Sequence, residues 1–362
     1  MISIAEKKVK LKNDIHLILD VFNSRNLNSI DSIILYGSYG RNEGAFFKKD
    51  NQVFVYNDYD ILLIVDEKIS ESNLNNIKNE LLLKIEIKWI DISQKLFSEL
   101  RNLKPTIFNF DLKYGSSVIY GDQNVFDQIP PFREEQITLL DVEILYFTRL
   151  YPFLITFEDG NFDLGEDEEK IRFFRNQWSK AVLAIVDSKL IRAKKYNSSY
   201  KIRSEILKVE YPKCKDVISL SNWALEEKLY PKGDFMSPLD MKKMFFKILN
   251  LYFEEMHLSL SLYYGKKIKT TDDLVIAKKY SIKQFIKQLK ELIVDRSLKP
   301  YRRRNRLLIL QSYAVEILLK EEIESKAIFN KCIKLIRNIC PKEVVNCTDY
   351  RSLIQLVIKL SR

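Results

Sequence analysis

Residues 33–65 read IILYGSYGRNEGAFFKKDNQVFVYNDYDILLIV, and this stretch decides the fold of the N-terminal part of the chain. It opens and closes with two short apolar runs, Ile33 to Tyr36 and Ile61 to Val65, in which β-branched residues are frequent. Short apolar runs bounded by turn-forming residues are typical of buried strands rather than of helices. We therefore expect two strands, with the candidate ligand-binding and catalytic residues between them.

Glycine is concentrated directly after the first of these runs. Gly37, Gly40 and Gly44 are three of only nine glycines in 362 residues. A glycine at a strand end allows backbone N–H groups to approach a phosphate, and a helix opening there would point its positive end at the anion. Ser38 adds a hydroxyl donor and Arg41 a fixed positive charge. The pattern indicates a phosphate-binding turn, although a Gly-Ser turn by itself is also a common structural feature.

Two aspartates, Asp58 and Asp60, stand at the entry to the second run. Successive side chains alternate along a strand, so both carboxylates are expected on one face and Tyr59 on the other. Two carboxylates on one face repel unless a cation lies between them, and their oxygens suit Mg²⁺. Taken alone, an Asp-x-Asp pair also occurs in turns, in calcium loops and in glycosyltransferases that use nucleotide sugars.

Gly37-Ser38 at the end of one strand and Asp58-Tyr59-Asp60 at the start of the next together resemble the nucleotidyltransferase superfamily, of the polymerase β and kanamycin nucleotidyltransferase type. The resemblance covers about residues 1–125. It implies a Gly-Ser turn that holds a nucleoside triphosphate (NTP) and acids that hold two Mg²⁺ ions, with Mn²⁺ as an alternative. Ser38 and Asp58 are further apart than is usual in the superfamily, so we expect residues 46–56 to form an inserted hairpin or loop.

Asp91 is the expected third acid of this site. Residues 83–92, LKIEIKWIDI, predict a strand in which Asp91 ends a row of apolar side chains. A carboxylate in such a row is costly unless it is paired or binds a metal, and the resemblance implies that it helps to activate the acceptor hydroxyl. The alternatives are a solvent-facing cap of a helix expected over 93–103, or a catalytic role for Glu86.

The rest of the chain predicts an α+β domain followed by an all-α region. Amphipathic spacing predicts a first helix over 4–25 and a second around 74–81, and the apolar run at 118–120 predicts a last strand of a small mixed sheet with flanking helices. Residues 123–135, which contain two consecutive prolines, predict a linker. We expect a catalytic domain over 1–125, a helical domain over 132–265 that packs on the active site, and a C-terminal helical domain over 270–362, with helices near 282–294, 307–319, 327–339 and 353–360.

Lys180 is the candidate for a cation supplied from the helical region. It lies on the polar face of a helix predicted by an apolar stripe over 171–185. The resemblance implies that a lysine on a helix after the catalytic domain reaches back to the triphosphate, while the alternative is a merely solvated face. Two further basic segments, KKYNSSYKIR at 194–203 and YRRRNR at 301–306, could contact a base or a polyanion, or could pack at helix ends.

Composition limits the chemistry of the chain. The net charge of +10 suits a triphosphate or a nucleic acid. Four cysteines without C-x-x-C spacing and only two histidines do not indicate a zinc site or a Ser-His-Asp triad. The charged N-terminus does not resemble a signal peptide, and no apolar run reaches the ~20 residues of a membrane span. We expect a cytoplasmic protein.

These observations predict an enzyme that transfers a nucleoside monophosphate from an NTP to an acceptor hydroxyl and releases pyrophosphate. A small-molecule acceptor is expected first, because the chain carries no recognised RNA-binding module. A protein or RNA acceptor is the alternative within the same activity. A non-catalytic nucleotide-binding or antitoxin-like partner protein is the alternative outside it.

Overall fold

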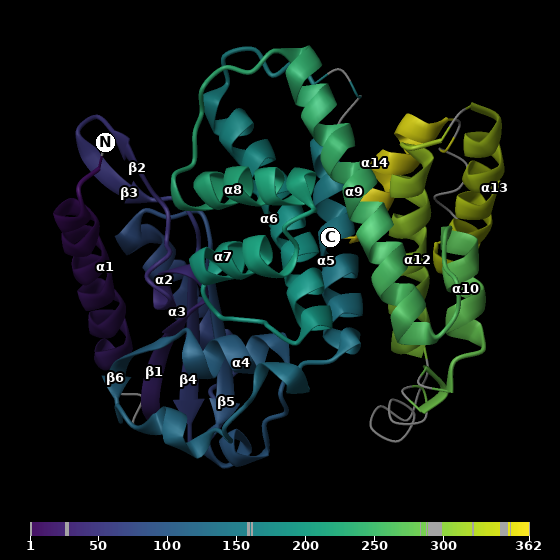
Figure 1. Cartoon of the computed structure of the whole chain (residues 1–362). Coiled ribbons are helices and arrows are strands. Elements are labelled where there is room, and N and C mark those ends of the chain that lie inside the picture. The colour runs from purple at the N-terminus through teal and green to yellow at the C-terminus, as the bar shows by residue number, and fades with distance from the viewer. Residues whose placement is uncertain are drawn as a thin grey trace. The chain divides into compact units, whose positions relative to one another are not determined.

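The computed structural model describes residues 2–25, 29–157, 160, 162–282, 284–286, 288, 299–320, 322–340, 347 and 349–361. It is a mixed α+β protein with a small sheet near the N-terminus and a helical C-terminal region (Figure 1), which confirms the expected class. Contacts divide the chain into two compact units, the first comprising 1–138, 193–213 and 225–231, and the second comprising 139–192, 214–224 and 232–362. The expected boundaries near 125–132 and 265–270 stay predictions.

The first unit is built on a four-stranded mixed sheet with strand order β5-β4-β1-β6. β1 (Ile30–Tyr36) and β4 (Tyr59–Val65) are the two strands predicted from the apolar runs, and they pair antiparallel at the centre. β5 (Ile90–Leu96) runs parallel to β4, and β6 (Ser117–Gly121) lies antiparallel to β1 as the expected last strand. The central residues 33–35 and 61–65 are buried, because both faces of these strands are covered.

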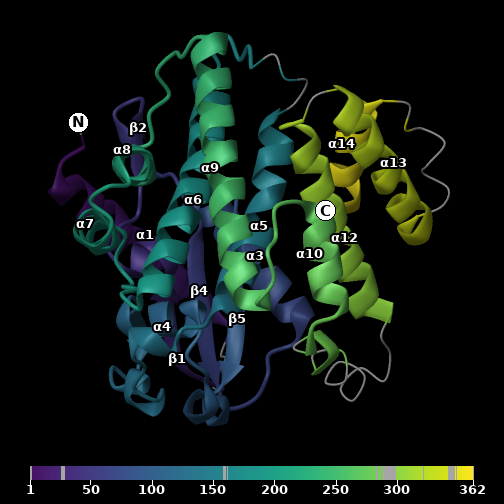
Figure 2. The same cartoon turned by 45° about the vertical axis from the view of Figure 1, so that its right-hand side comes forward.

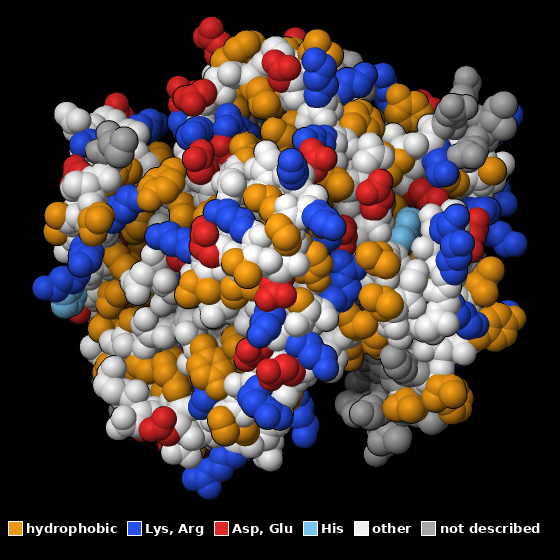
Figure 3. Space-filling view, in the orientation of Figure 1, with side chains coloured by type: hydrophobic (Ala, Val, Ile, Leu, Met, Phe, Trp, Pro, Cys, Tyr) orange, Lys and Arg blue, Asp and Glu red, His pale blue; other side chains and the backbone are white. Residues whose placement is uncertain are grey.

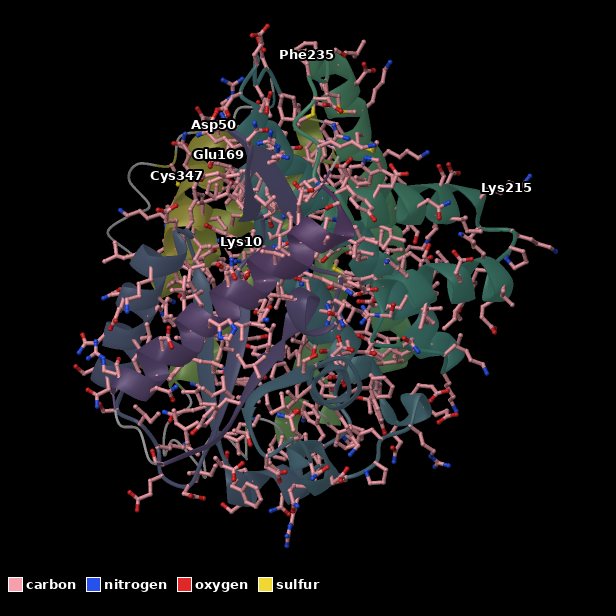
Figure 4. All side chains as sticks on the ribbon, turned by 90° about the vertical axis from the view of Figure 1, so that its left-hand side faces the viewer. Lys10, Asp50, Glu169, Lys215, Phe235 and Cys347 are labelled. Carbon is pink, nitrogen blue, oxygen red and sulfur yellow. The ribbon has the colours of Figure 1, made fainter. Side chains whose placement is uncertain are left out.

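Two helices share a hydrophobic core with this sheet. α1 (Ile4–Ser24) and α3 (Glu71–Ile85) contact each other, and their apolar faces join the core formed by β1 and β4. Figure 4 views the molecule from the side of α1, with Lys10 labelled on this helix. Ser3 and Glu6 form a capping box at the start of α1, and the Ser70 side chain caps α3.

The predicted insertion between the strands is a two-stranded hairpin. β2 (Phe46–Lys49) and β3 (Gln52–Val55) pair antiparallel. Asp50 and Asn51 at the tip have φ angles of 49° and 62°, as the favoured two-residue hairpin turn requires. Asp50 is labelled in Figure 4. The long interval between Ser38 and Asp58 is therefore occupied by a compact local element.

The predictions around Asp91 were wrong in their boundaries. Residues 83–92 are not one strand, because α3 continues to Ile85, Glu86 takes a left-handed conformation with φ 59°, and β5 begins only at Ile90. The helix expected over 93–103 is the rest of β5 followed by the 3-10 helix η1 (Phe97–Asn102).

The physical reason lies in the competing periodicities of this segment. LKIEIK alternates like a strand, but Ile77, Leu81 and Ile85 recur every four residues and are buried in the core. Burial of this helical stripe against the sheet outweighs the local alternation, since packing overrides weak strand propensity. Trp89, expected in the apolar row, is 56% exposed.

The predicted linker carries two short 3-10 helices, η2 (Val125–Gln128) and η3 (Glu134–Gln136). It packs against α4 (Ile107–Tyr114), a helix that was not predicted: Lys113 donates hydrogen bonds to the carbonyls of Phe126 and Ile129. The first unit also includes α7 (Tyr200–Glu210) and the last turns of α8 (Lys215–Leu229).

The second unit is entirely helical in its described residues (Figure 2). α5 (Leu139–Phe157), α6 (Glu168–Ala193) and α9 (Pro238–Tyr264) bury large aromatic side chains, among them Trp178 and Phe245. The apolar stripe predicted on α6 is confirmed as buried. The remaining helices are α10 (Thr271–Lys279), α12 (Lys299–Ile317), α13 (Glu322–Ile339) and α14 (Tyr350–Ser361). The helix expected over 282–294 falls largely outside the described residues.

The described surface carries charges of both signs. In the face shown by Figure 3, Lys and Arg side chains are interspersed with Asp and Glu. Within the described segments, no helix combines the length and the apolar character needed to cross a membrane.

Candidate active site

The strand register brings two of the predicted acids together. Asp60 on β4 is paired with Asp91 on β5 and, on its other side, with Tyr36 on β1. Directly paired residues project from the same face of a sheet, so these three side chains form one row across adjacent strands. Asp58 precedes β4 by one residue and stands two positions before Asp60. Tyr59 between them is buried on the opposite side, where its hydroxyl donates to Asp14 on α1 at 2.7 Å.

The electrostatics of Asp60 show how closely the acids are grouped. Burial, followed by the negative charges of Asp58 and Asp91, raises the pKa of the Asp60 carboxyl to about 7, against a smaller opposing effect of the cations Lys228 and Arg41. No described residue donates a hydrogen bond or forms an ion pair with any of the three carboxylates. The cluster therefore holds negative charge that the protein itself does not fully compensate.

Gly37 lies directly against this cluster. Its φ is +66°, and a Cβ atom at this position would lie 1.9 Å from Asp60 Oδ2. Both facts require glycine, because a side chain would be strained and would collide with the carboxylate. The expected helix after Gly37 is only the single turn α2 (Gly37–Gly40), so a dipole of a long helix is not available here. Ser38 is buried in this turn, and its carbonyl accepts the Glu43 N–H at 2.8 Å.

Arg41 is engaged by acidic residues rather than directed freely at a ligand. Its guanidinium lies 3.5 Å from a Glu43 oxygen and 3.4 Å from an Asp111 oxygen, and it stacks over the Tyr200 ring at 4.7 Å. Its charge still acts on Asp60. A direct contact of Arg41 with phosphate remains a prediction.

The loop that follows the Gly-Ser turn also fixes α7. Glu43 is 4% exposed, and its carboxylate accepts hydrogen bonds from Ser199 Oγ at 2.7 Å and from the backbone N–H groups of Tyr200 and Lys201 at 3.0 and 3.2 Å. A carboxylate at the first turn of a helix satisfies free N–H groups and the positive end of the dipole. Part of the basic segment 194–203 thus packs against the loop. This matches the second of the two alternatives given for the segment, packing at a helix end.

A second buried ion pair supports the same contact. Arg203 is 2% exposed, and its guanidinium lies 3.2 Å from an Asp111 oxygen on α4. Tyr196 donates its hydroxyl to the other Asp111 oxygen at 3.1 Å, and Arg203 stacks over its ring at 4.3 Å. These buried charges are paired, which is the condition under which burial is tolerated.

Two residues near the acids were missed by the sequence analysis. The Tyr36 hydroxyl has its pKa raised to about 12, first by burial and then by the charge of Asp60, while a hydrogen bond with Ser93 opposes the shift. Lys228, on the last turn of α8, is buried and acts electrostatically on Asp60. Tyr36 could have been found from the sequence, because it is the last residue of the predicted strand and directly precedes the Gly-Ser turn. No local pattern singles out Lys228 among 59 Lys and Arg residues.

Lys180, the predicted cation from the helical region, lies on α6 in the second unit. It is half-buried, and Asn176, one turn earlier, is buried. Its approach to the triphosphate stays a prediction. Lys228 and Arg41 are the cations of the first unit that act on Asp60.

In the described part of the chain, no group of three or more His, Cys, Asp or Glu side chains could hold a metal ion. Asp58, Asp60 and Asp91 would therefore need further ligands to bind Mg²⁺. Mg²⁺ is usually bound through one or two carboxylates, water and substrate phosphates rather than by a complete protein cage. The uncompensated carboxylates at Asp60 and its neighbours suit this partial ligand set. Asn57 Oδ1, next to Asp58, is also buried without a hydrogen-bond partner.

A cavity of about 470 Å³ lies in the same unit, between α7 and the end of α8. Its wall is mainly apolar, with Lys201, Glu205, Glu226 and Tyr230 supplying polar atoms. α7 is the helix whose first turn Glu43 holds, and the end of α8 carries Lys228. The volume is within the range of small-molecule sites.

Comparison of the chain with protein-family models, with curated proteins and with solved structures gave no significant match.

Proposed function

We propose that the protein is a Mg²⁺-dependent nucleotidyltransferase, which transfers a nucleoside monophosphate from an NTP to an acceptor hydroxyl and releases pyrophosphate. The observation that supports this most is the placement of the Gly37 backbone against Asp60, with Asp91 in register beside it and Asp58 two residues away. A turn that can approach phosphates thus stands next to clustered carboxylates that need a cation. Phosphoryl transfer requires this combination of positioning and charge neutralisation.

In this proposal, Asp58 and Asp60 hold Mg²⁺, and Asp91 completes the ligand set and accepts the proton of the acceptor hydroxyl. When bound, the metal would neutralise charge on the phosphates and favour attack at the α-phosphorus. Gly37 and Ser38 orient the triphosphate through the backbone N–H groups and the serine hydroxyl. Lys228 is the cation in the first unit that best fits the developing negative charge, and Lys180 and Arg41 are further candidates.

A small-molecule acceptor is favoured by the cavity between α7 and α8. Its volume of about 470 Å³ and its mainly apolar wall with a few polar atoms resemble a pocket for an organic molecule rather than a groove for a long polyanion. The alternatives are an RNA or protein acceptor, or nucleotide binding without catalysis. The experiment below distinguishes them from a small-molecule acceptor.

The test uses α-labelled NTPs, Mg²⁺ and an extract that contains small molecules, proteins and RNA in separate fractions. We expect label to appear in the small-molecule fraction with stoichiometric release of pyrophosphate. Label in RNA or protein would move the assignment to those acceptors. The proposal fails if no NTP binds in a Mg²⁺-dependent way, or if UDP-sugars bind more tightly than UTP, as a glycosyltransferase would require.

A further inference from the structure

Three arginines line a cavity in the second unit, whereas the acids assigned above belong to the first. Arg302, Arg303 and Arg306 on α12, with Asn338 and Ile339 at the end of α13, enclose a cavity of about 310 Å³. α12 and α13 are neighbours in contact and lie side by side in both views (Figures 1 and 2). Arg306 is four residues after Arg302 and three after Arg303, spacings that make helical side chains neighbours, and all three line the cavity.

The described residues that line this cavity do not balance its charge. None of them carries a carboxylate. Arg306 Nη1 donates to the Asn338 carbonyl at 3.2 Å, whereas no described residue forms a hydrogen bond or an ion pair with Arg302 or Arg303. Elsewhere in the same unit exposed lysines do have acidic partners, for example Lys247 with Asp216 at 2.9 Å. Three neighbouring cations repel one another, so an anion in the cavity would remove an unfavourable interaction.

The side chains that line the cavity indicate which class of anion would bind there. A guanidinium presents a rigid fork of N–H donors that matches two phosphate oxygens, and three such forks match a ligand with several adjacent phosphates. None of the described lining residues is aromatic, and the adjacent Tyr301 is buried, with its hydroxyl bonded to Gln284. A nucleobase would therefore find no stacking partner, which single-stranded nucleic acid sites use.

We propose that Arg302, Arg303 and Arg306 form a binding site for a linear di- or triphosphate group, separate from the Asp58 and Asp60 site and independent of Mg²⁺. The phosphate chain is the recognised feature, whether it is free or belongs to a nucleotide. The site does not depend on the proposed nucleotidyl transfer.

Isothermal titration of the full chain with inorganic tripolyphosphate in EDTA tests this site, because chelation removes the metal that the acidic site needs. The Arg302→Gln, Arg303→Gln double variant should weaken binding at least tenfold, since each loses a charge-assisted contact and about 1.4 kcal/mol is a factor of ten. Both residues are exposed and leave the Arg306 hydrogen bond intact, so the fold should be retained, which circular dichroism would verify.

The matched control is Lys334→Gln with Arg337→Gln, which removes two exposed charges from α13 outside the cavity. It should bind as the wild type does. The proposal is overturned if the control loses as much affinity as the test variant, if the test variant keeps wild-type affinity, or if poly(U) RNA binds while tripolyphosphate does not. ATP in EDTA identifies the source: equal affinity indicates a nucleotide phosphate chain, and weaker affinity a free one.

Discussion

At the scale of single residues, the acid cluster is determined by a few close approaches. Asp60 lies against Gly37, where an added Cβ atom would collide with its carboxylate, and beside two other carboxylates. The proximity of these like charges is unfavourable in the protein without a cation and would be useful once a cation is bound. Stability and activity should therefore respond in opposite directions to its substitution.

Asp60→Asn should abolish nucleotidyl transfer while stabilising the metal-free protein. The folded-state pKa of Asp60 is raised to about 7, so the folded protein binds a proton that the unfolded chain releases between about pH 4 and 7. The carboxylate consequently lowers stability as pH rises through this window, and its removal should raise the Tm at pH 8 but not at pH 4. Asp66→Asn, at the exposed position after β4, is the control for both readouts. Retention of more than about a tenth of the activity, a loss of under ~1.4 kcal/mol, would rule out the metal-ligand role.

Gly37→Ala should impair both folding and activity, because the added methyl group meets the Asp60 carboxylate at a left-handed φ. Two effects contribute at Gly37: backbone strain from the positive φ and the collision with Asp60. Gly165→Ala isolates the strain, since Gly165 has φ +56° and no atom within 4 Å of the added Cβ. We expect about 1 kcal/mol of destabilisation at Gly165 from backbone strain and at least twice that at Gly37. Chemical denaturation measures both, and equal losses would contradict the close approach.

His257 on α9 should make the protein less stable in mild acid. Burial lowers the pKa of its imidazole to about 4, while Asp273 acts in the opposite direction. The unfolded chain therefore binds the proton first as pH falls from about 6.5, and stability should decline down to about pH 4 and then level off. His257→Gln should flatten this decline by about 1–2 kcal/mol, measured by urea denaturation at pH 7 and pH 4.5. His16→Gln, at an exposed position on α1, should leave the slope unchanged.

At the scale of elements, the loop after the Gly-Ser turn joins chain segments that are far apart in sequence. The Glu43 carboxylate accepts hydrogen bonds from the first turn of α7. Asp111 on α4 forms ion pairs with Arg41 and Arg203 and accepts a hydrogen bond from Tyr196. The turn that is proposed to hold phosphate and the helix that lines the larger cavity are thus connected through the carboxylates of Glu43 and Asp111. Movement of α7 would be transmitted to the turn.

Glu43→Ala should release the first turn of α7. We expect about 1–3 kcal/mol of destabilisation, because three partly buried hydrogen bonds lose their acceptor, and faster amide exchange at residues 199–203. Glu205→Ala on the same helix is the control, since its side chain is 71% exposed. If exchange at 199–203 were the same in both variants, Glu43 would not be what holds α7.

At the scale of the whole molecule, the C-terminal helices complete the core of the helical unit. α12 and α14 both contact α5, and Lys278 on α10 forms a buried ion pair with Glu143 on α5 at 2.9 Å. Residues 270–362 therefore share packing surfaces with the helices expected to form a separate domain.

A chain ended at residue 269 should expose the face of α5 that these helices cover. We expect loss of a cooperative thermal transition in the helical signal, together with binding of a hydrophobic dye, because large apolar surfaces are rarely tolerated in water. Circular dichroism and dye fluorescence measure these effects. An unchanged Tm after truncation would show that 270–362 folds independently.

Local periodicity in the sequence predicted the two central strands, the first helix and the apolar stripe of α6, and the long interval between Ser38 and Asp58 predicted a hairpin or loop between the strands. The sequence also singled out Asp58, Asp60 and Asp91 as a group, from residue type and spacing. It did not determine where α3 ends, since a buried helical stripe competed there with a strand-like alternation.

The tertiary structure alone decided the long-range relations of the site. The register of β4 with β5 sets Asp91 beside Asp60, the fold brings Tyr36 and Lys228 to the acids, and Asp111 engages both Arg41 and Arg203. None of these pairings has a local signature, because electrostatic contacts between distant segments depend on how the elements pack and not on the spacing of residues along the chain.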